Sequence, residues 1–382
     1  MEEPPDAAGV PPVPDPPAPE PAADPPEQSP RAADPFMAEP VSFTGTGAEY
    51  FKIWIVNLAL TIVTLGIYSA WAKVRRLQYF YRHTRLAGAG FDYHGDPIAI
   101  LKGRIVGLVL FGLYSVIGYV NIWVAVGIVI GLALVMPWLL NRSLRFRFHN
   151  SSYRGLRFRF YGTTREAYWI FLAWPIFTGL SFFTLGPLWH HRLKRYQFSN
   201  AAYGRSRFSF NADAGEFYIT YILAVFTFFG LIVLLVAGLV GTGVLVALAG
   251  GPIEEDRVGL GVILFMITAG TLYAAVILAA QSITMSRIHN TCWNAARTDL
   301  HRFESRMAAW RLFAIQYTNL LATVATLGLF RPFAQVRLAR YYTSTLTVLG
   351  SASFEAYAAV DGDDVAAVGE ETADLFDFDI AF

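Results

Sequence analysis

The chain has 382 residues, of which 54% are hydrophobic and only 15% are charged, a composition that excludes an ordinary soluble globular protein and indicates a membrane protein. Its single cysteine, Cys292, excludes an internal disulfide. The net charge of +1 conceals a partition, because residues 1–40 and 355–382 carry 18 of the 29 acids, whereas residues 41–354 carry 29 bases and 11 acids.

The first forty residues contain 14 of the 20 prolines and almost no large apolar side chain. Such a segment cannot bury a core, so we expect a disordered, acidic, proline-rich tail over 1–40. Its start lacks the basic and then apolar pattern of a secretory signal peptide. A second acidic tail is expected over residues 358–382.

A glutamate follows an aromatic residue by six positions at three places where an apolar segment begins. Phe43 precedes Glu49, Phe160 precedes Glu166, and Phe210 precedes Glu216. A carboxylate in the first helical turn is favoured by the helix dipole. We therefore interpret Glu49, Glu166 and Glu216 as helix-start carboxylates, in preference to sites that bind a proton or a cation.

The tripeptide Thr-Leu-Gly occurs three times, ending at Gly66, Gly186 and Gly328. The fifteen residues from Gly66 align without a gap with those from Gly328, and those from Gly186 align with a small deletion. Glycine with a nearby proline is a bend signal inside an apolar run. We expect these three glycines to be hinges between half-length helices.

Five basic units follow the apolar segments, near residues 75–93, 145–160, 194–210, 286–298 and 336–354. Asn150, Tyr153 and Phe158 of the second unit match Asn200, Tyr203 and Phe208 of the third. Each unit begins with basic residues and passes through a small polar turn toward an aromatic-x-aromatic pair. This pattern predicts a basic helix end followed by a short β-hairpin.

The segment FTGTGAEYFKIWIVNLALTIVTLGIYSAWAKVRRLQYF, which begins at Phe43, resembles the start of the YjgN-like family of bacterial multi-spanning membrane proteins. The resemblance extends over about residues 43–357 and is most specific at Thr64–Gly66 and at Asn200–Phe210. The third repeat departs from it, with Ala309 where a glutamate is expected. The resemblance implies a bacterial inner-membrane protein, and it implies no particular reaction.

The basic residues also predict the topology. Of the 30 lysines and arginines, 27 lie within 73–104, 141–165, 189–211, 286–311 and 331–340. The positive-inside rule places these stretches, and both termini, in the cytoplasm. The segments 50–72, 167–188 and 309–331 are then expected to re-enter or to lie at the interface, because full crossings would carry basic residues outside. Full crossings, with the rule failing at these segments, are the alternative.

We therefore expect a mainly α, polytopic helical membrane protein with Thr-Leu-Gly-bent segments and short cytoplasmic β-hairpins. The membrane domain should cover residues 41–357. Its expected apolar segments are 50–72, 103–120, 122–140, 167–188, 217–249, 258–281 and 309–331.

Catalytic and metal-binding patterns are absent from the sequence. The seven histidines form no HExxH motif, and neither a GxSxG elbow nor a phosphate-binding glycine loop occurs. The pair His190-His191 has no acid or cysteine at ligand spacing. We expect no enzyme activity, no cofactor and no metal.

Lysines and arginines beside the inner leaflet attract anionic lipid, so membrane lipid is the first expected partner and nucleic acid is not expected. Two functions stay open: lipid or small-solute handling, and a non-catalytic scaffold that binds partner proteins through the cytoplasmic hairpins. The residues expected to contact anionic lipid are Arg75, Arg76, Arg145, Arg147, Lys194, Arg195, Arg205, Arg207, Arg337 and Arg340. The alternative is that these charges only fix the orientation of the protein in the membrane.

Overall fold

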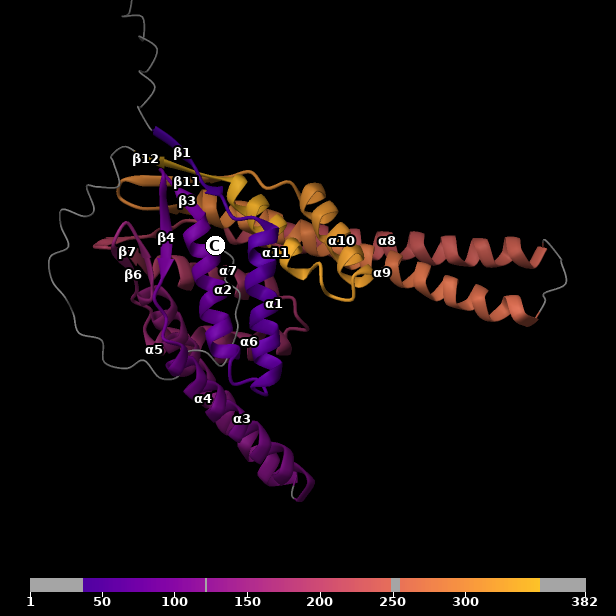
Figure 1. The fold of residues 1–382 in the computed structure, drawn as a ribbon, viewed down its shortest axis with the longest axis horizontal. Coiled ribbons are helices and arrows are strands. Elements are labelled where there is room, and N and C mark those ends of the chain that lie inside the picture. Colours follow the sequence, from indigo (N-terminus) through magenta and orange to yellow (C-terminus); the bar gives the residue numbers. More distant parts are fainter. Residues whose placement is uncertain (1–36, 121, 249–254, 351–382) are drawn as a thin grey trace, which may run out of the picture. The chain divides into compact units, whose positions relative to one another are not determined.

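The computed structural model describes residues 37–120, 122–248 and 255–350, and Figure 1 labels most of its helices and several of its strands. Most of the expected proline-rich tail, and all of the expected acidic tail over 358–382, lie outside these residues. Residues 37–40, which we assigned to the first tail, instead form strand β1 (Met37–Pro40). The composition misleads here because the backbone partner of β1 comes from the other end of the membrane domain, strand β12 (Leu346–Gly350).

Within the described residues the helices form five consecutive pairs. Three pairs are short, and each has a first arm of 17 residues. These short pairs are α1 (Gly47–Val63) with α2 (Ser69–His83), α5 (Thr164–Tyr168), η1 (Trp169–Ala173) and α6 (Trp174–Leu180) with α7 (Gly186–Ser199), and α10 (Ala309–Ala325) with α11 (Arg331–Ser344). The long pairs are α3 (Pro97–Val120) with α4 (Ile122–His149) and α8 (Ala214–Leu248) with α9 (Glu255–Ala295).

The π-helical segment η1 in the second short pair has a local cause. Pro175 has no backbone N–H, so a carbonyl group upstream of it loses its helical donor. The indole Nε1 of Trp189 on α7 donates to the carbonyl of Ile170 at 2.8 Å. This bond satisfies the carbonyl and joins the two arms of the pair.

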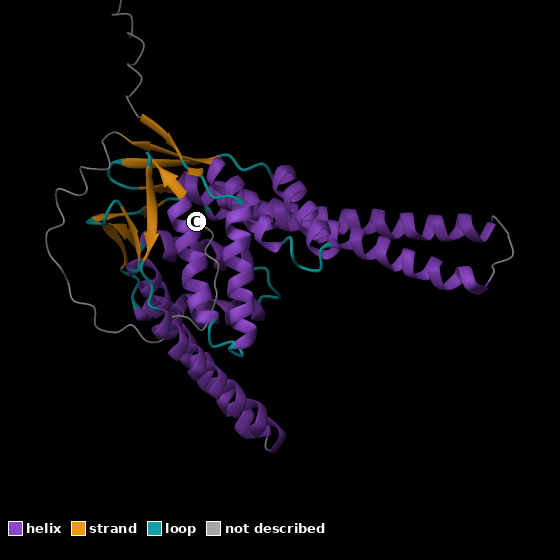
Figure 2. Ribbon diagram, in the orientation of Figure 1, coloured by secondary structure: helices purple, strands orange, loops and turns teal. Residues whose placement is uncertain are grey.

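Short antiparallel strands separate the helix pairs, as Figure 2 shows in orange. The seven-stranded sheet has the order β2 (Ser42–Phe43), β3 (Thr84–Leu86), β4 (Ala89–Tyr93), β5 (Ser151–Tyr153), β6 (Leu156–Phe160), β7 (Ala201–Tyr203) and β8 (Ser206–Arg207). The five-stranded sheet has the order β1, β12, β11 (His301–Ser305), β10 (Ala296–Arg297) and β9 (Ser209–Phe210).

The two sheets are joined at both ends. Strands β1 and β2 are separated by Val41 alone, and β8 and β9 are separated by Phe208 alone. Both linking residues stay in the ladder, since Val41 donates its N–H to Leu346 and Phe208 donates its N–H to Ala201, each at 3.0 Å. The strands of the described residues therefore close into one ring of pairings, which we call the strand ring.

The ring encloses an apolar core drawn from both sheets. Val41, Leu86, Tyr153, Tyr203 and Val348 are buried there, and partly buried phenylalanines pack around them. Alternation along β6 explains this packing, because Leu156 and Phe158 pack against the core while Arg157 between them is exposed. The interior of the ring is filled with side chains.

One hydrogen bond recurs wherever a helix pair returns to the ring. The acceptor is the carbonyl of the last residue of the returning helix or of the residue that follows it. The donor is the N–H of the residue that follows the strand just before the pair. The five bonds are Thr44 to His83 at 2.9 Å, His94 to Asn150 and Tyr161 to Asn200 at 2.8 Å, Asn211 to Ala295 at 3.2 Å and Arg306 to Thr345 at 3.0 Å. Both ends of every helix pair are thus attached to the strand ring.

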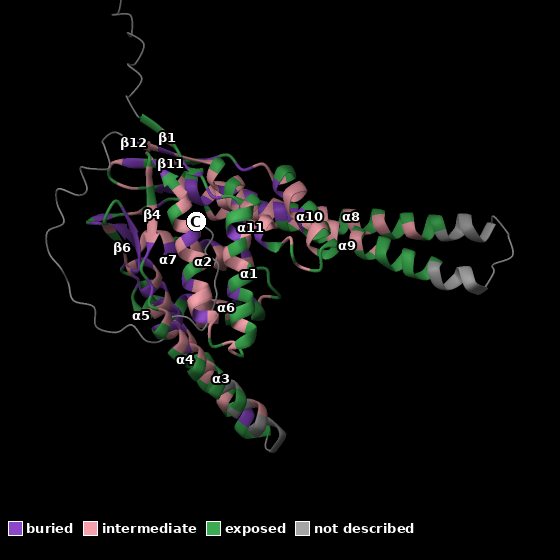
Figure 3. Cartoon of the chain, in the orientation of Figure 1, coloured by how far each residue is buried: buried purple, intermediate pink, exposed green. Residues whose placement is uncertain are grey.

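Three described helices contain a segment that is long and apolar enough to cross a membrane: Ile122–His149, Ala214–Thr242 and Gly261–Ala295. Many of their large apolar side chains are exposed, as the green residues of Figure 3 illustrate. The expected apolar segment 103–120 lies within α3, and its crossing stays a prediction.

Candidate functional site

The three helix-start glutamates lie in first helical turns. Glu49 and Glu166 each complete a capping box, in which a threonine hydroxyl accepts the glutamate N–H and the carboxylate accepts the threonine N–H. Thr46 and Thr163 are these threonines, at distances of 3.1 to 3.3 Å. Glu216 differs, because its carboxylate lies 3.6 Å from the guanidinium of Arg287 on α9.

The expected hinge glycines behave differently from one another. Gly66 and Gly328 have φ values of +94° and +93°, and each lies in the tight turn of a short pair. Gly186 is the first residue of α7 and has no such conformation. The turn of the second pair lies upstream, at Phe182 and Phe183, which have φ values of +50° and +65°.

Gly186 therefore does not take the left-handed position that Gly66 and Gly328 take in their turns. The amide of Gly66 donates to Thr61 at 2.8 Å, and the amide of Phe183 donates to Thr178 at 2.8 Å, in the same relation to the turn. In the second pair, the Thr-Leu-Gly tripeptide therefore lies three residues after the position expected from the turn at Gly66. A turn is set by its hydrogen bonds, and side chains other than glycine accept the left-handed region at a cost of about 1–2 kcal/mol.

Large apolar side chains cover the tips of the short pairs. Leu65 and Leu327 are each 95% exposed, and Phe182 is 89% exposed. No buried contact within the described chain accounts for a strained backbone that carries a fully exposed leucine or phenylalanine. Exposed apolar groups that gather at one place indicate an interaction with a membrane or a partner.

The ten expected lipid-contacting residues do not form one site. They lie on α2, α4, α7, α11 and the turn and strand that follow β7. Several bind the chain itself: Arg145 donates to the carbonyl of Gly162 at 2.9 Å, Arg340 to that of Gly45 at 3.1 Å, and Arg337 to Asn319 at 2.7 Å. Arg195 and Arg205 are exposed, and Arg76 and Arg147 are partly buried.

Arginines also lie over aromatic rings on the arms of the short pairs. The guanidinium carbon of Arg75 lies 5.7 Å from the ring centre of Tyr68, and that of Arg192 lies 4.9 Å from the ring centre of Trp174. Arg207 lies 4.4 Å from the ring of Tyr161 beside the strand ring. Arg192 was missed in the sequence because the aromatic partner is on the other arm of the pair, 18 positions earlier.

Lys194 is placed differently from the other expected residues. Its side chain is partly buried where α7 meets α9, and burial lowers the pKa of its ammonium group. The neighbouring His190 donates to or accepts from the hydroxyl of Tyr221 at 2.9 Å. Burial, followed by the charge of Lys194, lowers the pKa of His190 to about 4. Lys194 therefore lies in a polar cluster between helices.

His191 is buried, and its Nε2 lies 3.0 Å from the carbonyl of Ala212. Among the residues that the structure describes, no three acid, cysteine or histidine side chains gather as metal ligands. The expected absence of a metal stays a prediction.

Comparison with known proteins adds to this geometry. Residues 38–375 match the family model described as a bacterial protein of unknown function, DUF898. The chain is 29% identical over 135 residues to the inner membrane protein YjgN of Salmonella typhimurium, an alignment that covers 35% of this chain and 34% of the relative. It is 30% identical over 149 residues to the inner membrane protein YjgN of Escherichia coli K12, covering 37% and 36%. The chain thus aligns with about a third of the length of these curated relatives, and no solved structure matches it.

Proposed function

The chain belongs to the DUF898 family of bacterial proteins, and on that premise we propose that it is an inner-membrane protein that binds anionic phospholipid at the cytoplasmic leaflet. The arginines of the short helix pairs contact the head groups, and the apolar tips of these pairs enter the hydrocarbon region. The names of the curated relatives support a location in the inner membrane. The geometry of the short pairs supports the lipid contact.

The lengths of the helices support a shallow insertion of the short pairs. A first arm of 17 residues is about 25 Å long, whereas the hydrocarbon core of a bilayer is about 30 Å thick. The second arms are basic and return to the strand ring. The short pairs are then re-entrant, the long pairs cross, and the ring stays in the cytoplasm with the 27 basic residues.

The arrangement of Arg75 over Tyr68 and of Arg192 over Trp174 is the observation that carries the proposal. Tyr68 follows Gly66 by two residues, so the guanidinium of Arg75 reaches back toward the apolar tip. An aromatic ring beside an arginine is typical of the membrane interface, where the ring lies among acyl chains and the cation meets phosphate. Cations in residues 41–354 outnumber acids by 18, which leaves many of them available to anionic lipid.

We also propose that the five helix pairs are repeats of one structural element, which leaves the strand ring, returns to it and ends in one of the five basic units. The five equivalent backbone hydrogen bonds support this reading. So do the matched side-chain bonds of Asn150 to Phe146 and of Asn200 to Tyr196, both 3.0 Å. Repeats that alternate short and long would place three re-entrant pairs around two crossing pairs.

The alternative of a scaffold that binds partner proteins receives less support. Partners often add a strand to an exposed sheet edge. Among the described strands, those that pair on one side only are β1, β2, β8 and β9, at the ends of the two sheets, and each is two to four residues long. These short end strands offer little backbone for such an addition.

Replacing Arg75 and Arg192 together by glutamine tests the proposal. Binding of the purified protein to phosphatidylglycerol, measured as enrichment of this lipid over phosphatidylcholine in mixed nanodiscs, should fall roughly fivefold to thirtyfold, since each cation contributes about 1 kcal/mol near an anionic surface. The control replaces Arg85 and Arg302, two exposed arginines of the strand ring, by glutamine. Equal enrichment in both double variants would contradict the proposal.

A further inference from the structure

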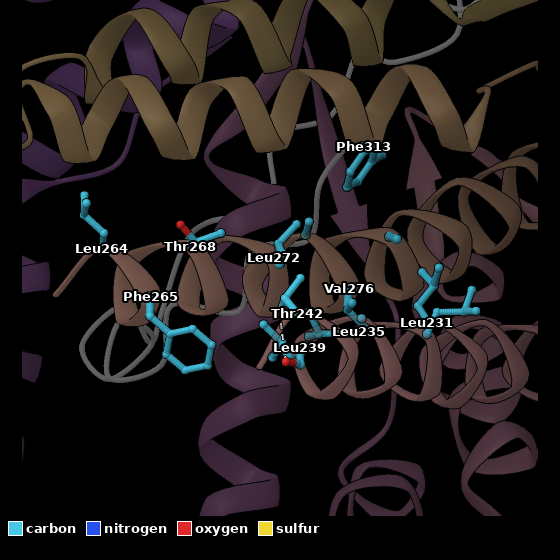
Figure 4. A pocket seen from close by; sticks show the side chains of 14 residues that line it. Leu231, Leu235, Leu239, Thr242, Leu264, Phe265, Thr268, Leu272, Val276 and Phe313 are labelled. Carbon is cyan, nitrogen blue, oxygen red and sulfur yellow. Dashed lines mark hydrogen bonds between the residues drawn. The ribbon is translucent and has the colours of Figure 1, made fainter. Parts of the chain in front are cut away.

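The groove between α8 and α9 offers an anionic head group no charged contact. It has a volume of about 830 Å³ and is bordered by Phe313 of α10, and each of its 14 lining residues is uncharged (Figure 4). The three short helix pairs are a different kind of surface, because each carries an arginine at the same position. These three arginines make unequal contacts, so they are not equally available to an anion.

The short pairs share one register about their turns. In each turn an N–H donates to the carbonyl five residues earlier, at 2.7 to 2.8 Å, and the donors are Gly66, Phe183 and Gly328. Nine residues after these donors, on the second arms, lie Arg75, Arg192 and Arg337. Nine residues before them, on the first arms, lie Asn57, Trp174 and Asn319. Because the arms are antiparallel, each arginine lies level with the residue on its first arm.

Arg337 of the third pair is held by the first arm of its own pair. Its Nη1 donates to Oδ1 of Asn319 at 2.7 Å, and its Nη2 donates to Oγ1 of Thr318 at 3.2 Å. The hydroxyl of Thr318 accepts this bond while it donates its own proton to the carbonyl of Ala314 at 2.7 Å. One N–H of each terminal nitrogen is thus occupied, and these are the donors of an end-on bidentate contact with a phosphate.

Arg75 of the first pair makes neither of these bonds. Its guanidinium carbon lies 5.7 Å from the ring centre of Tyr68. The Oδ1 atom of Asn57 is buried and has no hydrogen-bond partner in the described chain, although an unpaired buried acceptor costs free energy. The residue before Asn57 is Val56, whereas the residue before Asn319 is Thr318. The first arm therefore offers Arg75 one acceptor in place of two.

The second pair has neither acceptor. Trp174 stands at the position of the two asparagines, and Ala173 stands at the position of Thr318. The guanidinium carbon of Arg192 lies 4.9 Å from the ring centre of Trp174. The arginine thus lies over an aromatic ring in the two pairs that lack the hydroxyl, and it is bound to the first arm in the pair that has it.

We propose that Thr318 is a positioning residue that withholds Arg337 from anionic head groups, and that its equivalents Val56 and Ala173 leave Arg75 and Arg192 available to phosphate. An aromatic ring begins both returning helices, at Tyr68 and Phe330, so the presence of a ring does not account for the difference. The inference rests on the proposed function and deepens it, because it assigns the head-group contact to the first and second pairs and not to the third.

Two exchanges of similar side chains test the inference in opposite directions. Val56→Thr gives the first pair the hydroxyl, and Thr318→Val removes it from the third, and both positions are exposed. The first measurement needs no lipid: the full-length protein in detergent is treated with phenylglyoxal, which condenses with the terminal nitrogens of arginine, and each modified arginine is quantified by mass spectrometry. Arg75 of the wild-type protein should react faster than Arg337. Val56→Thr should slow Arg75, and Thr318→Val should accelerate Arg337, each roughly threefold to tenfold.

The second measurement is the enrichment of phosphatidylglycerol over phosphatidylcholine in mixed nanodiscs. Thr318→Val should raise it roughly threefold to fivefold, because one more cation becomes available to the lipid, and Val56→Thr should lower it by a similar factor. Thr318→Ser keeps the hydroxyl and should match the wild-type protein. The gain should vanish when Thr318→Val is combined with Arg337→Gln. If Thr318→Val is not recovered as the wild-type protein is, Thr318→Ala, which also lacks the hydroxyl, replaces it.

The two proposals fail in different ways. Arginine reactivities that stay the same in both exchanges would overturn the inference. Changed reactivities with unchanged enrichment would also overturn it, and the proposed function would stand if the Arg75 and Arg192 double variant still loses enrichment. A double variant that keeps its enrichment would refute the proposed function, and the assignment of head-group contacts to the first two pairs would fail with it.

Discussion

At the scale of single residues, the polar cluster around Lys194 and His190 is the least expected feature. Two adjacent histidines suggested, at most, a metal site. The structure instead separates them: His190 meets Tyr221 of α8, and His191 meets the backbone at Ala212. Sequence spacing did not predict the cluster because Tyr221 belongs to the next helix, 31 residues after His190, and burial arises only when those helices pack.

The cluster predicts a loss of stability in mild acid. The pKa of His190 is lowered from 6.5 to about 4 by burial and then by Lys194. As the pH falls from about 6.5 toward 4, the unfolded chain binds a proton that the folded chain does not, so the free energy of unfolding decreases. The loss from this group is at most about 3 kcal/mol.

Thermal unfolding of the detergent-solubilised protein at pH 7 and pH 5 measures this effect. His190→Gln removes the titrating group and should make the difference in melting temperature between the two pH values smaller than in the wild-type protein. An unchanged difference would show that His190 does not titrate in this range.

At the scale of elements, the turns of the short pairs show how position determines conformation. The hydroxyls of Thr64, Ser181 and Thr326 each accept a hydrogen bond from the N–H of the residue four positions later, at 2.9, 3.2 and 3.0 Å. Each hydroxyl therefore holds the N–H of the residue just before the returning helix. The three turns are alike in these bonds, although the second has Phe182 and Phe183 where the others have Leu and Gly.

Gly66 and Gly186 end identical tripeptides in the sequence, but their backbone conformations differ, so the same substitution should have different effects on stability. Gly66→Ala should lower the free energy of unfolding by about 1 kcal/mol or more, because φ is +94° there. Gly186→Ala should be neutral or slightly stabilising, since residue 186 is helical and an added Cβ would meet Thr178 only at 3.9 Å. Denaturant unfolding of both variants measures the difference, and equal losses would contradict the assignment of the second turn.

At the scale of the whole molecule, the sequence predicted the order of helices and hairpins better than their assembly. Charge-free runs, helix-start glutamates and aromatic alternation are local signals, and they indicated the helix pairs and the strands beside them. The pairing of Phe91 with Tyr153 and of Phe158 with Tyr203 joins different units, and no local signal encodes it. The closed ring likewise depends on β1 and β12, which are about 300 residues apart.

The candidate lipid surface was predicted only in part for the same reason. A count of charges identified basic units, but it did not distinguish Arg145, which binds a carbonyl, from Arg192, which lies over a ring on the other arm.

The central claim is that all five units attach to one cytoplasmic ring and that the short pairs do not cross the membrane. Single cysteines placed at the exposed residues Arg85, Arg205 and Ser344 test it most directly, with the wild-type chain as the background, because Cys292 is only 3% exposed. Trp123→Cys, at the start of α4 in the first long pair, is the control for the outer face. An impermeant thiol reagent added to intact cells should label the cysteine at 123 and spare the other three until the cells are permeabilised. Labelling at 205 in intact cells, with 85 protected, would show that the second short pair crosses and would contradict the account.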